Sequence, residues 1–106
     1  MIVRIWRGEA KADRADAYVR HVTGTVFPSL HGLRGHRSAH LLQRKAATAV
    51  EFLAVTEWES REAIEAFAGK DIETAIVEPE ARAILSSFDD FARHYERVED
   101  GNEFRS

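Results

Sequence analysis

Histidine is the side chain that most readily exchanges protons near neutral pH, and this sequence contains five of them. His94 is the most interesting, because a histidine inside a predicted central strand either faces a pocket or needs a hydrogen-bond partner in the core. In a catalytic role, it would accept the proton of a phenol and so prepare an electron-rich anion for reaction with oxygen. In a structural role, it would be a satisfied core residue. We keep His94 as the candidate catalytic residue with both interpretations open.

A metal site is not predicted. His36 and His40 have the i, i+4 spacing that joins two ligands on a helix, but we expect them on a strand, where four residues span about 13 Å. The sequence has no cysteine and no H-E-x-x-H motif. The carboxylates of Glu78 and Glu80 lie beside a predicted helix start, where capping and solvation explain them. We therefore expect neither a metal nor any other bound cofactor.

Four further residues are candidates to line a substrate pocket: Tyr18, His21, Phe67 and Trp6. Tyr18 and Phe67 lie on the inward faces of predicted helices, and His21 follows Tyr18 by about one helical turn. Aromatic side chains of this kind can stack on a flat ligand, although more often they simply fill a core. Trp6, on the first strand, could instead belong to a dimer interface, where tryptophan is enriched.

The elements that must position these residues follow from hydrophobic periodicity and from capping and turn residues. We expect four strands, over residues 2–7, 36–44, 50–58 and 88–98. A helix should begin at Asp13 and end before Pro28, a second helix should run from Ser60 to Gly69, and a last helical segment should open at Pro79. This order is the split βαβ pattern of ferredoxin-like folds, an α+β class with a four-stranded antiparallel sheet and helices on one face.

The predicted strands are apolar on both faces. In residues 50–58, Phe52 and Trp58 share one face, whereas Leu53 and Val55 share the other, because successive side chains alternate. The helices can cover only one face of such a sheet, and a solvated second face should be mostly polar. We therefore expect the second face to pack against the sheet of another copy, which makes the protein a homodimer.

Composition narrows the remaining possibilities. The length of 106 residues suits a single domain over residues 1–98, followed by a polar tail at 99–106. The lack of cysteine, of an apolar export signal and of any apolar run near the roughly 20 residues that cross a bilayer predicts a cytoplasmic protein without membrane contact. The net charge of -3, with both signs interspersed, argues against nucleic acid as a partner.

The stretch FLAVTEWESREAIEAFAGKD at residues 52–71 resembles the antibiotic biosynthesis monooxygenase family. The opening IVRIWRG, the triplet DAY at 16–18 and the run HYERVE at 94–99 fit this resemblance as well. The resemblance implies a dimeric α/β barrel, in which two ferredoxin-like sheets face each other and each subunit keeps a pocket between its sheet and its own helices. The family it resembles contains cofactor-independent oxygenases that turn phenolic polyketides into quinones, haem-degrading oxygenases, and many members with no known activity.

Haem degradation is disfavoured at the residue level. The haem-degrading branch uses an asparagine on the first strand, a tryptophan in the helix after the WES-like motif and a histidine after that helix. Here Phe67 occupies the tryptophan position, residues 75–77 replace the histidine, and the only asparagine is Asn102. We therefore expect a cofactor-independent monooxygenase that acts on a small phenolic or polycyclic aromatic compound. The alternative is a non-catalytic small-ligand-binding or assembly module of the same dimeric fold.

Overall fold

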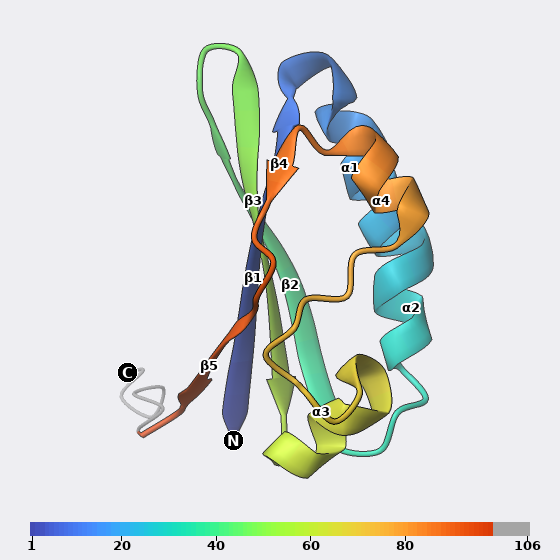
Figure 1. Ribbon diagram of the computed structural model, residues 1–106, viewed down its shortest axis with the longest axis vertical. Coiled ribbons are helices and arrows are strands. Elements are labelled where there is room, and N and C mark those ends of the chain that lie inside the picture. Colours follow the sequence, from blue (N-terminus) through green and yellow to red (C-terminus); the bar gives the residue numbers. More distant parts are fainter. Residues whose placement is uncertain (99–106) are drawn as a thin grey trace, which may run out of the picture.

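The computed structural model describes residues 1–98, so the predicted polar tail lies outside the described residues. The chain forms two layers, with an antiparallel sheet on one side and all the helices against a single face of it (Figure 1). This confirms the predicted α+β class and the one-sided helical cover. No helix among the described residues is long and apolar enough to span a membrane.

Three ten-residue strands form most of the sheet: β1 (Ile2–Lys11), β2 (His36–Lys45) and β3 (Ala49–Trp58). The strand order is β2-β3-β1-β4, as a ferredoxin-like arrangement requires. β1 pairs with β3 along its whole length, from Ile2 opposite Trp58 to Lys11 opposite Ala49. The side chains of Ile2, Phe52 and Trp58 are buried beneath the helices, as the predicted alternation requires.

The last predicted strand is divided into two. β4 (Ser87–Phe88) and β5 (Arg93–Glu96) both pair with β1, and the amide of Asp89 still donates to the carbonyl of Arg7 at 3.0 Å, but residues 90–92 leave the ladder. These residues bond instead to the segment before α4: Phe91 forms a bridge with Thr74, and the amide of Ala75 donates to the carbonyl of Asp90 at 2.9 Å. The prediction of one continuous strand was wrong because this competing partner is distant in sequence.

The N-terminal helical region begins and ends differently from the prediction. It starts with a 3₁₀ turn (Ala12–Arg14) and α1 (Ala15–His21), and Asp13 makes no capping hydrogen bond. It then widens into a π-helical turn (Val22–Val26) and continues as α2 (Phe27–Leu30). Pro28 therefore lies within the helical region instead of ending it. It lies in the first turn of α2, directly after the π turn, whose hydrogen-bonding pattern differs from that of a regular α-helix.

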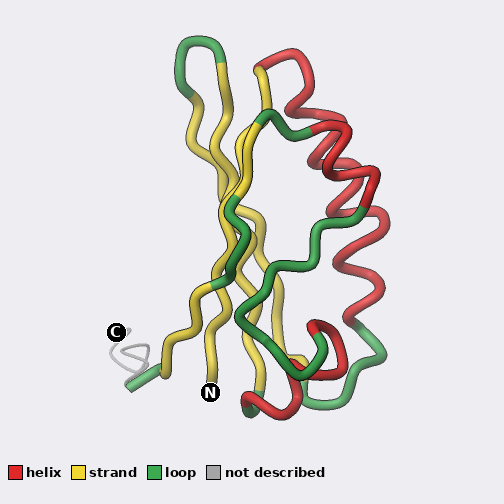
Figure 2. Tube along the Cα trace, viewed as in Figure 1, coloured by secondary structure: helices red, strands yellow, loops and turns green. Residues whose placement is uncertain are grey.

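Two short helices complete the helical layer. α3 (Arg61–Ala68) begins at Ser60, whose hydroxyl accepts a hydrogen bond from the amide of Ala63, as predicted. α3 ends at Gly69, which has a positive φ of 82°. α4 (Pro79–Ile84) opens at Pro79, again as predicted. Between these helices, residues 69–78 cross the molecule without regular secondary structure, and we call them the crossing segment (Figure 2).

The sheet face away from the helices carries an apolar patch. Its residues lie opposite one another on neighbouring strands, in the pairs Val3 with Tyr95, Ile5 with Val55, and Leu42 with Leu53. Leu42 and Tyr95 are about half exposed in the single chain. Ion pairs of Glu51 with Arg7 and Arg44, and of Glu57 with Arg97, border the patch. We call this surface the outer patch.

Candidate functional site

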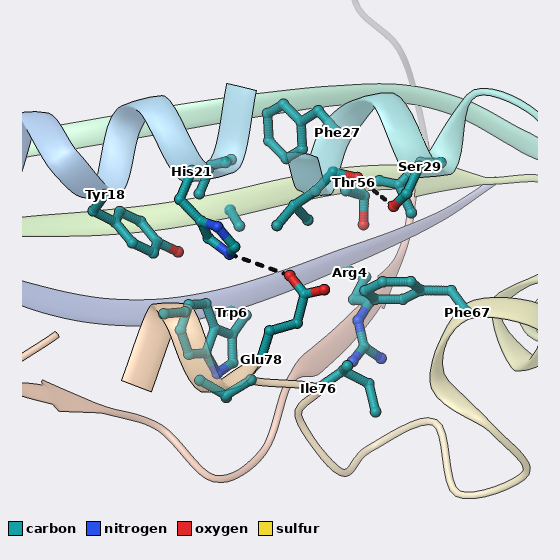
Figure 3. A pocket seen from close by; sticks show the side chains of 16 residues that line it. Arg4, Trp6, Tyr18, His21, Phe27, Ser29, Thr56, Phe67, Ile76 and Glu78 are labelled. Atoms are coloured by element: carbon teal, nitrogen blue, oxygen red, sulfur yellow. Dashed lines mark hydrogen bonds and ion pairs between the residues drawn. The ribbon is translucent and has the colours of Figure 1, made fainter. Parts of the chain in front are cut away.

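A pocket of about 100 Å³ lies between the sheet and the N-terminal helices, and part of the crossing segment forms another wall (Figure 3). All four residues predicted to line a pocket are in its wall: Tyr18, His21, Phe67 and Trp6. Most of the remaining surface is aliphatic and comes from residues such as Val22, Val26 and Leu30. The pocket is thus an apolar space with a few polar groups, the usual form of a small-molecule site.

The π-helical turn explains how one helical region contributes so many lining residues. Tyr18, Val22, Val26 and Leu30 recur every four residues, and all of them line the pocket. In a regular α-helix a four-residue step overshoots one turn, so such a row drifts around the helix. The wider π turn over Val22–Val26 holds more residues per turn and keeps the row facing the sheet.

Arg4 is the most unusual group in the wall, because it is a cation that is only 4% exposed. Its guanidinium donates to the carbonyl of Ile72, to the carbonyl of Thr74 at 3.4 Å and to Nε2 of His94 at 3.0 Å. These three acceptors are neutral. The ring of Phe67 lies below the guanidinium, with Cζ of Arg4 5.6 Å from its centroid.

No carboxylate among the described residues forms an ion pair with Arg4. Burial lowers the pKa of Arg4 to about 10, with no acidic neighbour to oppose the shift. The side chain therefore remains charged at neutral pH, and its charge is compensated only by neutral dipoles. Because a buried charge without a counter-ion is costly, this corner of the pocket favours an anion.

His94, the predicted catalytic residue, lies behind Arg4 and is not among the residues that line the pocket. Burial is the main cause that lowers the pKa of His94, and the charges of Arg4 and Arg61 lower it further. Because an arginine can only donate, Nε2 of His94 is the acceptor and the ring proton is on Nδ1. Nδ1 is buried and has no hydrogen-bond partner among the described residues.

His21 does face the pocket, and it meets two carboxylates there. Its Nε2 lies 3.2 Å from an oxygen of Glu78 (Figure 3), and its Nδ1 lies 3.6 Å from an oxygen of Glu80. The side chain of His21 is 5% exposed, whereas that of Glu78 is 45% exposed at the rim. The interpretation of Glu78 and Glu80 as capping or solvated residues therefore missed their contact with His21.

The two remaining aromatic candidates are held in fixed positions. Tyr18 packs against Phe52 with ring centroids 4.8 Å apart, and burial raises the pKa of its phenol to about 12. Tyr18 is therefore a neutral donor and not a base. Trp6 donates its indole hydrogen to the carbonyl of Asp89 at 2.7 Å, and its ring lies over Gly8, where a Cβ would approach it to 3.0 Å.

The pocket fits neither haem nor a protein-bound metal ion. Pockets for drug-sized ligands measure roughly 300–1,000 Å³, and haem is no smaller than such ligands, so the pocket of about 100 Å³ offers no preformed space that would enclose it. Within residues 1–98, no group of three histidine, cysteine, aspartate or glutamate side chains is arranged to hold a metal.

Sequence reasoning missed Arg4 and the pairing of His21 with Glu78. One signal for Arg4 was available: it lies between Ile2 and Trp6 on the same face of a strand, so alternation alone points it toward the covered side. The approach of Glu78 to His21 had no such signal, because it depends on where the crossing segment runs.

Comparison with known proteins places this geometry in a family. Residues 1–79 match the family model for antibiotic biosynthesis monooxygenases. No curated protein matches the sequence.

Three solved structures share the fold at low sequence identity. A candidate antibiotic biosynthesis monooxygenase from Deinococcus radiodurans has 14% identity and a TM-score of 0.66, over 96% of this chain and 97% of the other. One from Bacillus cereus has 16% identity and a TM-score of 0.64, over 93% and 94%. The haem degrader MhuD from Mycobacterium tuberculosis, solved with two haems in its active site, has 19% identity and a TM-score of 0.59, over 94% and 98%. On the family match, which covers most of its length, this chain belongs to the antibiotic biosynthesis monooxygenase family.

Proposed function

We propose that this protein is a cofactor-independent monooxygenase of small, single-ring phenols. The observation that carries the proposal is the position of His21 in the wall of an apolar pocket, with a carboxylate oxygen of Glu78 3.2 Å from its Nε2. A histidine backed by a carboxylate is a suitable general base, because the carboxylate stabilises the imidazolium that forms.

In the proposed reaction, Nε2 of His21, which is buried and has no hydrogen-bond partner among the described residues, accepts the phenolic proton, and the carboxylates of Glu78 and Glu80 stabilise the resulting positive charge. The phenolate forms in a pocket whose only buried cation among the described residues is Arg4, so the local field favours the anion. The phenolate is a far better electron donor to oxygen than the phenol. His94 then has a positioning role, because it accepts a hydrogen bond from Arg4 and helps to fix the guanidinium.

The oxidation balances without a cofactor. A phenol with a free ring C–H gains one oxygen atom and loses two hydrogen atoms as it becomes a quinone, which is a four-electron oxidation. Dioxygen takes up these electrons: one of its atoms enters the ring, and the other leaves as water with the two hydrogens. All the electrons therefore come from the substrate.

The volume of the pocket supports a single ring over a polycyclic substrate. A cavity of about 150 Å³ holds benzene in an engineered protein, and the pocket here is about 100 Å³ with a partly exposed rim at Glu78 and Ile76. One ring fits if it extends toward that rim. Every fused ring adds to the volume that the ligand needs, and a single ring already has to extend to the rim, so we narrow the expected substrate to monocyclic phenols.

The direct test is oxygen consumption with resorcinol, a monocyclic phenol with electron-rich ring positions. We expect uptake of isotopically labelled dioxygen, with one labelled atom in the hydroxyquinone and the other in water. The controls are Glu62→Gln, a substitution on the exposed side of α3, which should retain the activity, and His21→Gln, which should lose it. Binding of resorcinol without oxygen uptake would instead support the alternative, a ligand-binding module without chemistry.

We also infer that two copies associate through the outer patch. The patch joins apolar side chains from all three long strands and from β5, and ion pairs border it. A contiguous exposed apolar surface with a polar rim is typical of an interface. In this arrangement each pocket stays beneath the helices of its own subunit, on the face opposite the interface.

A further inference from the structure

We propose that the substrate is a phenol that carries a carboxylate on the same ring, bound with the carboxylate on the guanidinium of Arg4 and the hydroxyl toward His21. The hydroxyl end of this assignment rests on the proposed function. The carboxylate end rests on Arg4 alone and holds for a ligand that never reacts. The two can therefore be tested separately.

The charge of Arg4 is the first argument. A guanidinium that is 4% exposed usually has a carboxylate partner within the protein, because burial of an unpaired charge is costly. Here its three acceptors, the carbonyls of Ile72 and Thr74 and the Nε2 of His94, are all neutral. A carboxylate on the ligand would supply the missing counter-ion in the wall of the pocket itself.

The donors of Arg4 give the second argument. A guanidinium has five N–H donors, and the acceptors within residues 1–98 occupy both on Nη1 and one on Nη2. The hydrogen on Nε and one on Nη2 remain. These two atoms form the side edge of the guanidinium, which matches the two oxygens of a carboxylate. A phenolate offers a single oxygen and cannot meet the two donors with two parallel hydrogen bonds.

The surroundings of Arg4 hold this fork of two donors, Nε and Nη2, in place. The ring of Phe67 lies against one face of the guanidinium, and the carbonyls of Ile72 and Thr74 hold it from the crossing segment. A preorganised group loses little freedom when it binds.

The positions of Arg4 and His21 define the ligand geometry. Arg4 lies in the sheet wall, on β1, and His21 lies in the helical wall, at the end of α1 (Figure 3). A hydroxyl ortho to the carboxylate would remain beside Arg4. A meta or para hydroxyl points away from the carboxylate and toward the helical wall. We therefore expect meta- and para-hydroxylated acids to bind in preference to ortho isomers.

The test is anaerobic calorimetric titration with three matched ligands: 3,5-dihydroxybenzoate, its neutral amide, and the isomer 2,6-dihydroxybenzoate. We expect 3,5-dihydroxybenzoate to bind at least about tenfold more tightly than the amide, as a charged bidentate pair in a buried site predicts. We also expect it to bind more tightly than the ortho isomer. Equal affinity for the acid and the amide, or no binding of either at millimolar concentration, would overturn the proposal.

Two variants test whether the preference for the acid over the amide depends on Arg4. Arg4→Gln should remove the preference for the acid over the amide, and Arg4→Lys, which keeps the charge without the fork, should retain part of it. A preference that persists in Arg4→Gln would place the carboxylate elsewhere and contradict the proposal. If Arg4→Gln does not fold, the comparison of acid with amide in the unmodified protein still shows whether the pocket recognises the carboxylate. Because no oxygen is present, a failure of the oxygenase reaction leaves these results unchanged.

Discussion

The guanidinium of Arg4 donates a hydrogen bond to Nε2 of His94 at 3.0 Å, and the two residues are directly opposite each other on β1 and β5. This pairing requires a neutral imidazole, because a protonated ring would have no lone pair to offer and would add a second positive charge. The position of Arg4 in the pocket is thus coupled to the protonation state of a residue outside it.

This coupling predicts a dependence of stability on pH. Burial, with the charges of Arg4 and Arg61, lowers the pKa of His94 below its ordinary value of 6.5, and Glu73 only partly opposes the shift. Below pH 6.5 the unfolded chain therefore binds a proton that the native protein does not. The free energy of unfolding should fall as the pH decreases through this range and down to the native pKa. Chemical denaturation between pH 7.5 and about 5 measures the slope.

The control for this prediction is His94→Gln, which keeps an acceptor for Arg4 but cannot titrate. It should reduce the slope. His36 also has a lowered pKa, mainly because of burial, so His36→Gln should reduce the slope by its own separate share. A slope unaltered by His94→Gln would show that His94 is not the coupled group.

Turnover should distinguish the two histidines. His21→Gln removes the proposed base and should lower kcat for resorcinol by roughly 10²- to 10⁴-fold. Glu78→Gln should have a smaller effect in the same direction, because it only stabilises the imidazolium. His94→Ala should lower kcat by less than His21→Gln does, since it releases Arg4, which favours the phenolate, without removing the base. Steady-state oxygen uptake measures all three variants, and the reverse pattern, with kcat lost only in His94→Ala, would make His94 the base.

The outer patch predicts a dimer at micromolar concentration. Leu53→Arg places a charge at its centre, beside Leu42 and Val55, and should produce a monomer. Ala66→Arg introduces the same side chain on the exposed face of α3 and should leave the dimer intact. Sedimentation velocity measures the mass of each variant. A well-folded monomer of the unmodified protein at micromolar concentration would contradict the inference.

The cap of α3 predicts a local effect on stability. Ser60→Ala removes the acceptor for the amide of Ala63 and should lower the free energy of unfolding by about 1 kcal/mol. Ser60→Asp restores an acceptor and should recover most of that loss. Urea denaturation measures this free energy. Because α3 carries Phe67, which lines the pocket, the affinity for 3,5-dihydroxybenzoate should be titrated for the same variants. An unchanged midpoint in Ser60→Ala would mean that the cap contributes nothing.

The parts of the fold that sequence could predict depend on short-range rules. Strand faces follow from alternation, so the burial of Phe52 and Trp58 on one side was predictable. The limits of α3 follow from the capping residue Ser60 and from Gly69. The continuation past Pro28 was not predicted, because it depends on a π turn that no simple periodicity encodes.

The residues of the candidate site likewise divide into those that sequence could predict and those that it could not. Tyr18 and Phe67 could be placed in a pocket because apolar residues on an amphipathic helix face inward. Arg4 and Glu78 were missed because charged residues are usually solvated. Strand alternation could have revealed Arg4, whereas only the tertiary path of the crossing segment brings Glu78 to His21.

The interruption between β4 and β5 also affects how the molecule resists aggregation. Unpaired strand edges invite other chains to add strands, and short edge strands discourage this. Here one edge of the sheet is formed by two short pieces separated by residues that bond elsewhere. The opposite edge, β2, has a bulge near its start and carries Arg37, Arg44 and Lys45. The sheet can therefore present a broad apolar face to a partner while its edges discourage the open-ended strand addition that leads to fibrils.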